Sequence, residues 1–138
     1  MFERDYLMRL IAELGAAIRR SLERDQGMDR TATDSAQMLE AAVGVATELD
    51  GVALLSLSPE SIAQVIEVSG TDPRVTEYIA CSLLLCSRYY AEDGNEPLAD
   101  LRAKQAFAIA DAYGHDLAED DASPEAIEAF LDRELLDD

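Results

Sequence analysis

The chain of 138 residues contains no tryptophan, one histidine, one lysine, two cysteines, four prolines and seven glycines. A single histidine supplies no second imidazole ligand for a transition metal, and catalysis that depends on histidine would have to use that one position. The scarcity of proline and glycine, with 49% hydrophobic residues, is typical of a globular chain and not of a disordered one. Abundant alanine without tryptophan favours helices that pack closely together.

The two cysteines, Cys81 and Cys86, are badly placed to act together. A separation of five residues puts them about 140° apart around a helix, which prevents an intrahelical disulfide or a shared metal ion. Their neighbours Leu83, Leu84 and Leu85 predict two small, buried apolar side chains. We therefore expect neither redox chemistry nor metal binding from them.

Motifs that carry catalysis are also missing. The sequence contains no GxxxxGK[ST], GxGxxG, HExxH or GxSxG, and no cysteine lies close in sequence to the histidine. We expect Ser82 and Ser87, which lie in an apolar segment, to bond to backbone carbonyl groups and not to attack a substrate. The sequence therefore favours a protein that is not an enzyme and has no cofactor, although an active site built from residues far apart in the sequence stays open.

Charge of one sign dominates the chain. It has 29 acidic and 11 basic residues, which gives a formal net charge of -18. Residues 1–30 are neutral, so the whole acidic excess lies in residues 31–138. Such a field repels phosphate backbones, and we expect the protein to bind neither DNA nor RNA. The acidic surface could serve solubility alone, receive the arginine-bearing first segment, or bind a basic partner.

Residues 1–24 are predicted to form one amphipathic helix. Its apolar side chains fall within an arc of roughly 160°, which is wide enough to contact two neighbouring helices. They are Tyr6, Leu7, Leu10, Ile11, Leu14, Ala17, Ile18 and Leu22. Because Glu3, Arg4, Asp5 and Arg9 interrupt the segment, it has neither the apolar core of a secretory signal nor the run of about 20 apolar residues that spans a membrane. We expect a cytoplasmic protein with no membrane partner, and an interfacial anchor is the alternative.

Three segments combine a helix-capping residue with proline: Ser58-Pro59-Glu60, Thr71-Asp72-Pro73 and Ser123-Pro124-Glu125. Serine or aspartate at the N-cap, followed by proline in the first turn, is a common start of a helix. These starts and the apolar periodicity between them predict an all-α fold of five or six helices, in a single domain over 1–138. Short connections favour antiparallel neighbours. The expected helices cover residues 1–24, 33–49, 59–69, 73–91, 97–113 and 124–136.

Finer details of these helices also follow from the sequence. Thr33 or Asp34 is expected to cap the helix over 33–49, and Asp50-Gly51 to end it. Residues Val52 to Leu57 could mimic a strand, but no second convincing strand exists to pair with them, so we expect a packed loop or a short helical turn. The helix over 73–91 has very little polar circumference and is the best candidate for the most buried helix.

The first eleven residues resemble the start of a family of small, functionally uncharacterised helical proteins from Gram-positive and related anaerobic bacteria. They read Met1-Phe2-Glu3-Arg4-Asp5-Tyr6-Leu7-Met8-Arg9-Leu10-Ile11, and members of that family open with M-(F/Y)-E-x-D-Y-(I/L)-M-R-(L/M)-I. The helix start Leu57-Ser58-Pro59-Glu60 is similar to one in the same family. The resemblance implies a helical architecture and a bacterial origin, and it implies no activity, substrate or catalytic residue.

The central helix hairpin, over residues 75–113, also resembles a tetratricopeptide hairpin. Tyr89 lies on its first helix, and Ala103, Phe107 and Ala110 lie on its second with the spacing of that motif. The separation of Tyr89 from Ala103 is longer than in the motif by about five residues. Generic packing in a helical bundle therefore stays open beside tetratricopeptide-like packing.

Four residues of this hairpin are the candidate binding residues: Tyr78, Arg88, Tyr89 and Tyr113. Tyr78 and Tyr89 are nearly in line on one helix face, and Tyr113 could approach them from the next helix. A tyrosine-lined groove between the helices could receive a protein or peptide, and acidic side chains around it would select segments that carry Lys or Arg. Packing of the rings in the core is the alternative.

Two other functions stay open. His115 lies in an acidic turn with Asp111, Asp116 and residues 119–121, whose oxygen atoms could hold a divalent cation in a metal-dependent hydrolase or in a small-ligand-binding protein. A plain acidic turn is the simpler interpretation of this cluster. The broad apolar arc of residues 1–24 could instead form a structural homodimer.

Overall fold

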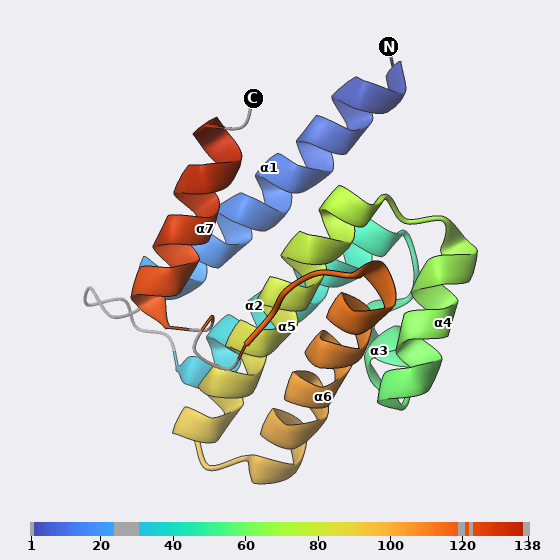
Figure 1. Ribbon diagram of the computed structural model, residues 1–138. Coiled ribbons are helices and arrows are strands. Elements are labelled where there is room, and N and C mark those ends of the chain that lie inside the picture. Colours follow the sequence, from blue (N-terminus) through green and yellow to red (C-terminus); the bar gives the residue numbers. More distant parts are fainter. Residues whose placement is uncertain (1, 24–30, 119–120, 122, 137–138) are drawn as a thin grey trace.

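The computed structural model describes residues 2–23, 31–118, 121 and 123–136, and this part of the chain forms seven helices (Figure 1). They are α1 (Phe2–Leu22), α2 (Ala32–Thr47), α3 (Gly51–Leu55), α4 (Pro59–Ser69), α5 (Pro73–Glu92), α6 (Glu96–Tyr113) and α7 (Pro124–Leu136). No strand occurs among the described residues, so the all-α prediction is confirmed. The sequence predicts five or six helices, and the additional one is α3, a short helix in the segment where a packed loop or a short helical turn is expected.

Local capping chemistry starts α4 and α5 at the residues that the sequence predicts. The Ser58 hydroxyl accepts a hydrogen bond from the Ser61 amide at 3.2 Å, and the Asp72 carboxylate accepts one from the Arg74 amide at 2.8 Å. Each cap satisfies an amide that has no partner within its own helix. At the far end of α6, Gly114 has a φ of 72° and ends the helix, as predicted.

α2 begins one residue earlier and ends two residues earlier than predicted, and its caps differ from the predicted ones. Thr31 is the N-cap, because its hydroxyl accepts from the Asp34 amide at 3.0 Å and the Asp34 carboxylate accepts from the Thr31 amide at 3.2 Å. Thr33 instead donates from its amide and its hydroxyl to the carboxylate of Asp93, at 2.9 and 2.6 Å. Asp50 does not end α2 but caps α3, by accepting from an amide in its first turn. The bond from Thr33 to Asp93 joins residues 60 apart, so the local sequence could not predict this contact of Thr33.

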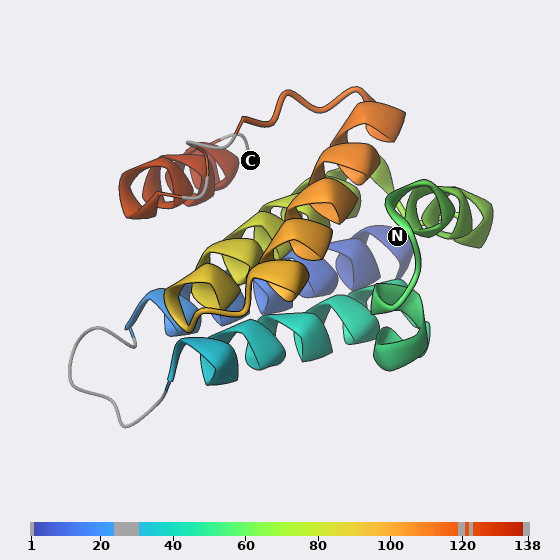
Figure 2. The ribbon, with the colours of Figure 1, turned by 90° about the horizontal axis from the view of Figure 1, so that it is seen from below.

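α5 is the central helix of the core, as its nearly complete apolar circumference predicts. α1 and α2 lie on one side of it and α6 lies on the other, after a short turn (Figure 2). The buried residues of α5 are Val75, Thr76, Tyr78, Ile79, Ala80, Cys81, Ser82, Leu83, Leu84, Leu85, Cys86, Tyr89 and Tyr90. They occupy every side of the helix, so α5 holds the other elements together. Tetratricopeptide-like packing of α5 and α6 stays a prediction.

α1 packs against both α2 and α5, which is the two-sided contact that its broad apolar arc predicts. Tyr6 is the exception in that arc, because 42% of its surface is exposed. On the polar face, the Arg19 guanidinium lies 3.5 Å from Glu128 and 3.9 Å from Asp132, both on α7. Within the described ranges, every helix is too short or too polar to cross a bilayer.

The cysteines and serines of α5 have the structural roles that the sequence predicts. Cys81 and Cys86 are free and buried. The Cys86 thiol donates to the carbonyl oxygen of Ala36 on α2 at 3.4 Å. The hydroxyls of Ser82 and Ser87 donate to backbone carbonyl groups at 2.8 and 2.7 Å. These groups therefore serve the packing of α5.

Candidate functional site

Two of the predicted binding residues, Tyr78 and Tyr89, lie in the core. Only 4% and 3% of their surfaces are exposed. The Tyr89 hydroxyl donates to the hydroxyl of Ser21 on α1 at 3.0 Å, and the Tyr78 ring packs edge-on against Phe130 of α7 with 4.9 Å between centroids. Core packing, the alternative to a tyrosine-lined groove, therefore describes both residues, because α1 and α7 cover the face on which they lie.

The other two predicted residues are separated from each other. Arg88 is half-buried on α5, with its Nε 3.8 Å from the Glu92 carboxylate. Tyr113 is half-buried at the end of α6, and its ring stacks on His115 with 6.0 Å between centroids. Partial burial, with a smaller effect of Glu67, raises the pKa of the Tyr113 hydroxyl. These residues do not extend a common binding surface from Tyr78 and Tyr89.

His115 makes contacts that fasten the segment after α6 to the start of α5. Its Nε2 lies 3.0 Å from the Thr76 hydroxyl and 3.1 Å from the carbonyl oxygen of Pro73, and its Nδ1 lies 3.9 Å from the Glu77 carboxylate. The Pro73 carbonyl can only accept, so this geometry suits a proton on Nε2. The ring therefore has a structural role at this junction.

The suggested metal ligands Asp111, His115 and Asp116 do not gather around one point. Among the residues that the structure describes, no group of three or more His, Cys, Asp or Glu side chains is arranged to hold a metal ion. Glu119 and Asp120, which belong to the same acidic turn, lie outside the described residues. His115 and Asp116 do line a cavity of about 460 Å³ under α7.

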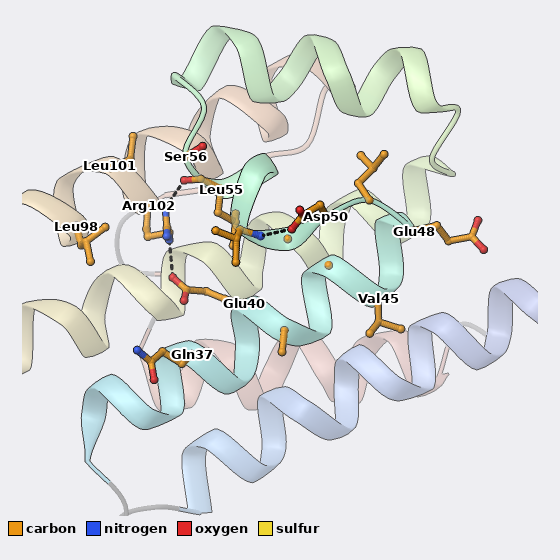
Figure 3. Close-up of a pocket in the computed structure, with 15 residues that line it drawn as sticks. Gln37, Glu40, Val45, Glu48, Asp50, Leu55, Ser56, Leu98, Leu101 and Arg102 are labelled. Atoms are coloured by element: carbon orange, nitrogen blue, oxygen red, sulfur yellow. Dashed lines mark hydrogen bonds and ion pairs between the residues drawn. The ribbon is translucent and has the colours of Figure 1, made fainter.

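A larger groove, of about 990 Å³, lies between α2, α3 and α6 (Figure 3). α2 forms one wall, α3 and the residue after it form the second, and the first two turns of α6 form the third. The lining residues are Gln37, Glu40, Ala41, Gly44, Val45, Glu48, Leu49, Asp50, Gly51, Val52, Leu55, Ser56, Leu98, Leu101 and Arg102. Residues as far apart in the sequence as Gln37 and Arg102 thus line one concave surface.

Two valines of this groove are exposed to an unusual degree. Val45 on α2 is 61% exposed and Val52 on α3 is 85% exposed, and both line the groove. Half-buried Leu49, Leu98 and Leu101 continue the apolar lining. A concave apolar surface with a few polar groups is the usual form of a binding site. This groove therefore replaces the tyrosine pair as the candidate site.

A buried ion pair, between Glu40 of α2 and Arg102 of α6, forms the floor of the groove. The Arg102 Nε donates to Glu40 Oε2 at 2.8 Å, and the two side chains are 8% and 16% exposed. The Tyr90 hydroxyl donates to the same oxygen at 2.9 Å. Burial and this hydrogen bond raise the pKa of the Tyr90 hydroxyl well above its usual value, so the hydroxyl remains a donor.

The same arginine holds the α3 wall in position. Arg102 Nη1 donates to the carbonyl oxygen of Leu55 at 2.8 Å and to the Gln105 side-chain oxygen at 3.0 Å. The Gln105 amide donates to the carbonyl oxygens of Leu55 and Leu57, at 3.0 and 2.9 Å. These bonds satisfy carbonyl groups that the end of α3 leaves without helical partners. The groove is therefore preformed by hydrogen bonds.

Arg102 is not among the binding residues predicted from the sequence, although the sequence contains a signal for it. Arg102 comes three residues after Ala99 and four before Ala106, so it lies on the inward face of its helix with two buried alanines. A lone charge on an apolar face requires a buried partner. That partner, Glu40, could not be named in advance because 62 residues separate the two.

Comparison of the chain with protein-family models, curated proteins and solved structures finds no match.

Proposed function

We propose that this chain is a non-enzymatic protein-interaction module, which binds a peptide segment of a partner protein in the groove between α2, α3 and α6. The segment carries apolar side chains and at least one Lys or Arg. The observation that supports this proposal is the exposure of Val45 and Val52, 61% and 85%, in the lining of one preformed groove.

The apolar part of the proposal follows from the cost of exposing these side chains to water. Complete burial of a valine or leucine side chain contributes roughly 1.5–3 kcal/mol relative to full exposure. A few anchors of this kind, centred in a concave surface, supply most of the binding energy of a typical interface. Val45, Val52 and Leu101 offer such contacts to one apolar segment.

The basic part of the proposal follows from the charges at the edge of the groove. Glu48 and Asp50 are exposed at the end of the groove where α2 stops, and the last turn of α2 carries no basic residue. The C-terminal end of a helix carries a partial negative charge, which adds to that of the two carboxylates. The net charge of -18 also attracts a basic segment over a longer range.

The polar groups of the groove support binding in preference to catalysis. Glu40 and Arg102 are paired with each other, and the Asp50 carboxylate accepts from the Val52 amide at 3.1 Å. These bonds serve the architecture of the groove, and the groups that make them are held in place by one another.

Selection from a displayed library of random twelve-residue peptides, against the full chain, tests the proposal. We expect binders with apolar residues next to Lys or Arg, and we expect Val52→Glu to weaken their binding at least about ten-fold. Val68→Glu is the matched control, because Val68 is 88% exposed on α4 and lies outside the groove. It should leave the affinity within about two-fold of the unchanged chain.

Three outcomes would overturn the proposal. The first is a library that yields no binder, and the second is equal loss of binding in the Val52 and Val68 variants. The third is a concentration-dependent dimer of the free chain that Val52→Glu dissociates, measured by sedimentation, because the groove would then hold a second copy of the chain.

A further inference from the structure

Only one of the two oxygens of the Glu40 carboxylate accepts a hydrogen bond from a described residue. The contacts of Glu40 with Arg102 and Tyr90 both end on Oε2, at 2.8 and 2.9 Å. Among the described residues, Ser35 Oγ is the one fully buried side-chain nitrogen or oxygen that lacks a hydrogen-bond partner. Oε1 of Glu40 receives no bond from a described residue and is therefore not fully buried, and Glu40 is one of the residues that line the groove.

A carboxylate oxygen in this position can accept a charge-assisted hydrogen bond beside the one from Arg102. The Glu40 side chain is 16% exposed, so water screens its charge less than it screens the charges of Glu48 and Asp50, which are exposed at the edge of the groove. Its position is fixed from two sides, because Arg102 and Tyr90 hold the other oxygen. A cation that reached Oε1 would find an acceptor that needs no rearrangement.

The cation must come from a long side chain. Apolar side chains, among them Val52 and Leu101, line the same groove as Glu40, and an aliphatic stem can lie along such a lining while its charged end reaches a carboxylate. Lysine and arginine have stems of this kind.

We propose that Glu40 determines the specificity of the groove, by pairing its Oε1 with the side-chain cation of one Lys or Arg in the docked segment. This inference depends on the proposed function, because it names the contact that selects the segment. The edge carboxylates Glu48 and Asp50 attract the same cation from a distance, while Glu40 fixes its final position.

The contact can be mapped on the unchanged protein. A library-selected peptide that contains one lysine, and that loses binding to the Val52→Glu variant, is treated with a zero-length carbodiimide cross-linker. Mass spectrometry then identifies the carboxylate that forms an amide with that lysine. We expect Glu40, and cross-links to Glu48 or Asp50 alone would overturn the inference while leaving the proposed function intact.

A thermodynamic cycle gives an independent measurement. Replacing the peptide lysine by norleucine keeps the stem and removes the charge, and it should weaken binding at least about ten-fold to the unchanged chain. The same replacement should matter less than about two-fold in a Glu40→Gln variant and should keep its full effect in the control variant Glu60→Gln, because Glu60 is exposed on α4 and lies outside the groove. If the lysine matters equally in all three chains, Glu40 does not select it.

The two proposals fail in different ways. Peptides that bind in the groove without enrichment of Lys or Arg would overturn the role of Glu40 alone. If the Glu40→Gln variant does not fold, the cross-linking result and the norleucine peptide on the unchanged chain still decide the inference.

Discussion

Gly44 and Gly51 bring the backbones of α2 and α3 into direct contact. A Cβ added to Gly44 would lie 3.2 Å from the Cα of Gly51 and 3.4 Å from its nitrogen. These are backbone atoms, so they cannot rotate away as the end of a long side chain could. The absence of a side chain at Gly44 thus sets how closely α3 approaches α2, and with it the width of the groove.

Replacement of Gly44 by alanine tests this contact. In a helix interior the change normally stabilises a protein by roughly 0.5–1 kcal/mol, because alanine loses less conformational freedom on folding. At Gly44 we expect the steric conflict to cancel or reverse that gain. At Gly15 the added Cβ would make ordinary contacts, 3.8 Å to Leu131 and 3.9 Å to Tyr78, so the same replacement should show the full gain. Urea unfolding of both variants measures the difference, and equal gains would contradict the tight contact.

Replacement of Arg102 by alanine should be among the most destabilising changes in α6. It leaves the carboxylate of Glu40, which is 16% exposed, without its cation and removes the bond to the Leu55 carbonyl. Breaking a buried pair in this way costs about 3–5 kcal/mol. Lys104→Ala is the control on the same helix, because Lys104 and its partner Asp100 are both 64% exposed, and it should change the free energy of unfolding by less than about 1 kcal/mol. A small effect of Arg102→Ala in equilibrium unfolding would mean that the pair is dispensable.

The thiol of Cys81 should be unreactive in the folded protein. Burial, with smaller effects of Asp121 and Glu77, raises its pKa from 9.0 to about 12, and the thiolate is the reactive form. At pH 8 we expect a disulfide reagent such as DTNB to label the chain slowly, and rapidly once urea unfolds it. Fast labelling of the native protein would show that the cavity beside Cys81 opens.

The same thiol should make stability depend on pH in the alkaline range. Because the folded pKa of Cys81 lies above its unfolded value of 9.0, the protonated thiol contributes stability that is fully present below pH 9 and is lost as the pH rises toward 12. Cys81→Ala should therefore show a shallower loss of unfolding free energy between pH 9 and 11 than the unchanged chain. Identical pH profiles of the two chains would contradict this assignment.

α7 should be held by apolar contacts more than by its ion pairs. Ile127 has no exposed surface, and Ile127→Ala is expected to cost about 2–5 kcal/mol. Arg19 and its partner Glu128 are 40% and 53% exposed, so Arg19→Ala should cost less than about 1 kcal/mol. Thermal unfolding at low and at high salt checks the comparison, and strong salt dependence with a small effect at Ile127 would reverse the order.

The elements that the sequence predicts well are those that depend on neighbours in the chain. Ser58 and Asp72 bond to amides two or three residues away, so the starts of α4 and α5 can be predicted from a short window. The central position of α5 is predictable for a related reason, because a helix that is apolar on nearly every side must be covered on nearly every side.

The features that could not be predicted depend on contacts between distant residues. Helical periodicity places Tyr89 on one face of α5, but only the fold shows that Ser21, 68 residues earlier, covers its hydroxyl. The groove has the same origin, because Glu40 and Arg102 meet only when α2 and α6 are packed. α3 is a third case, since a short apolar run is compatible with a strand, a loop or a helical turn until its neighbours are known.

The hydrogen bonds from the Gln105 side chain to the carbonyl oxygens of Leu55 and Leu57 also affect the order of folding during synthesis. Gln105, which donates to both carbonyl groups, is translated 50 and 48 residues after them. A ribosome-bound chain that ends before this glutamine contains the sequences of α2 and α3 but lacks the Gln105 side chain, which hydrogen-bonds to the α3 wall of the groove. The α3 wall of the groove is therefore fixed in position only late in translation, when α6 emerges.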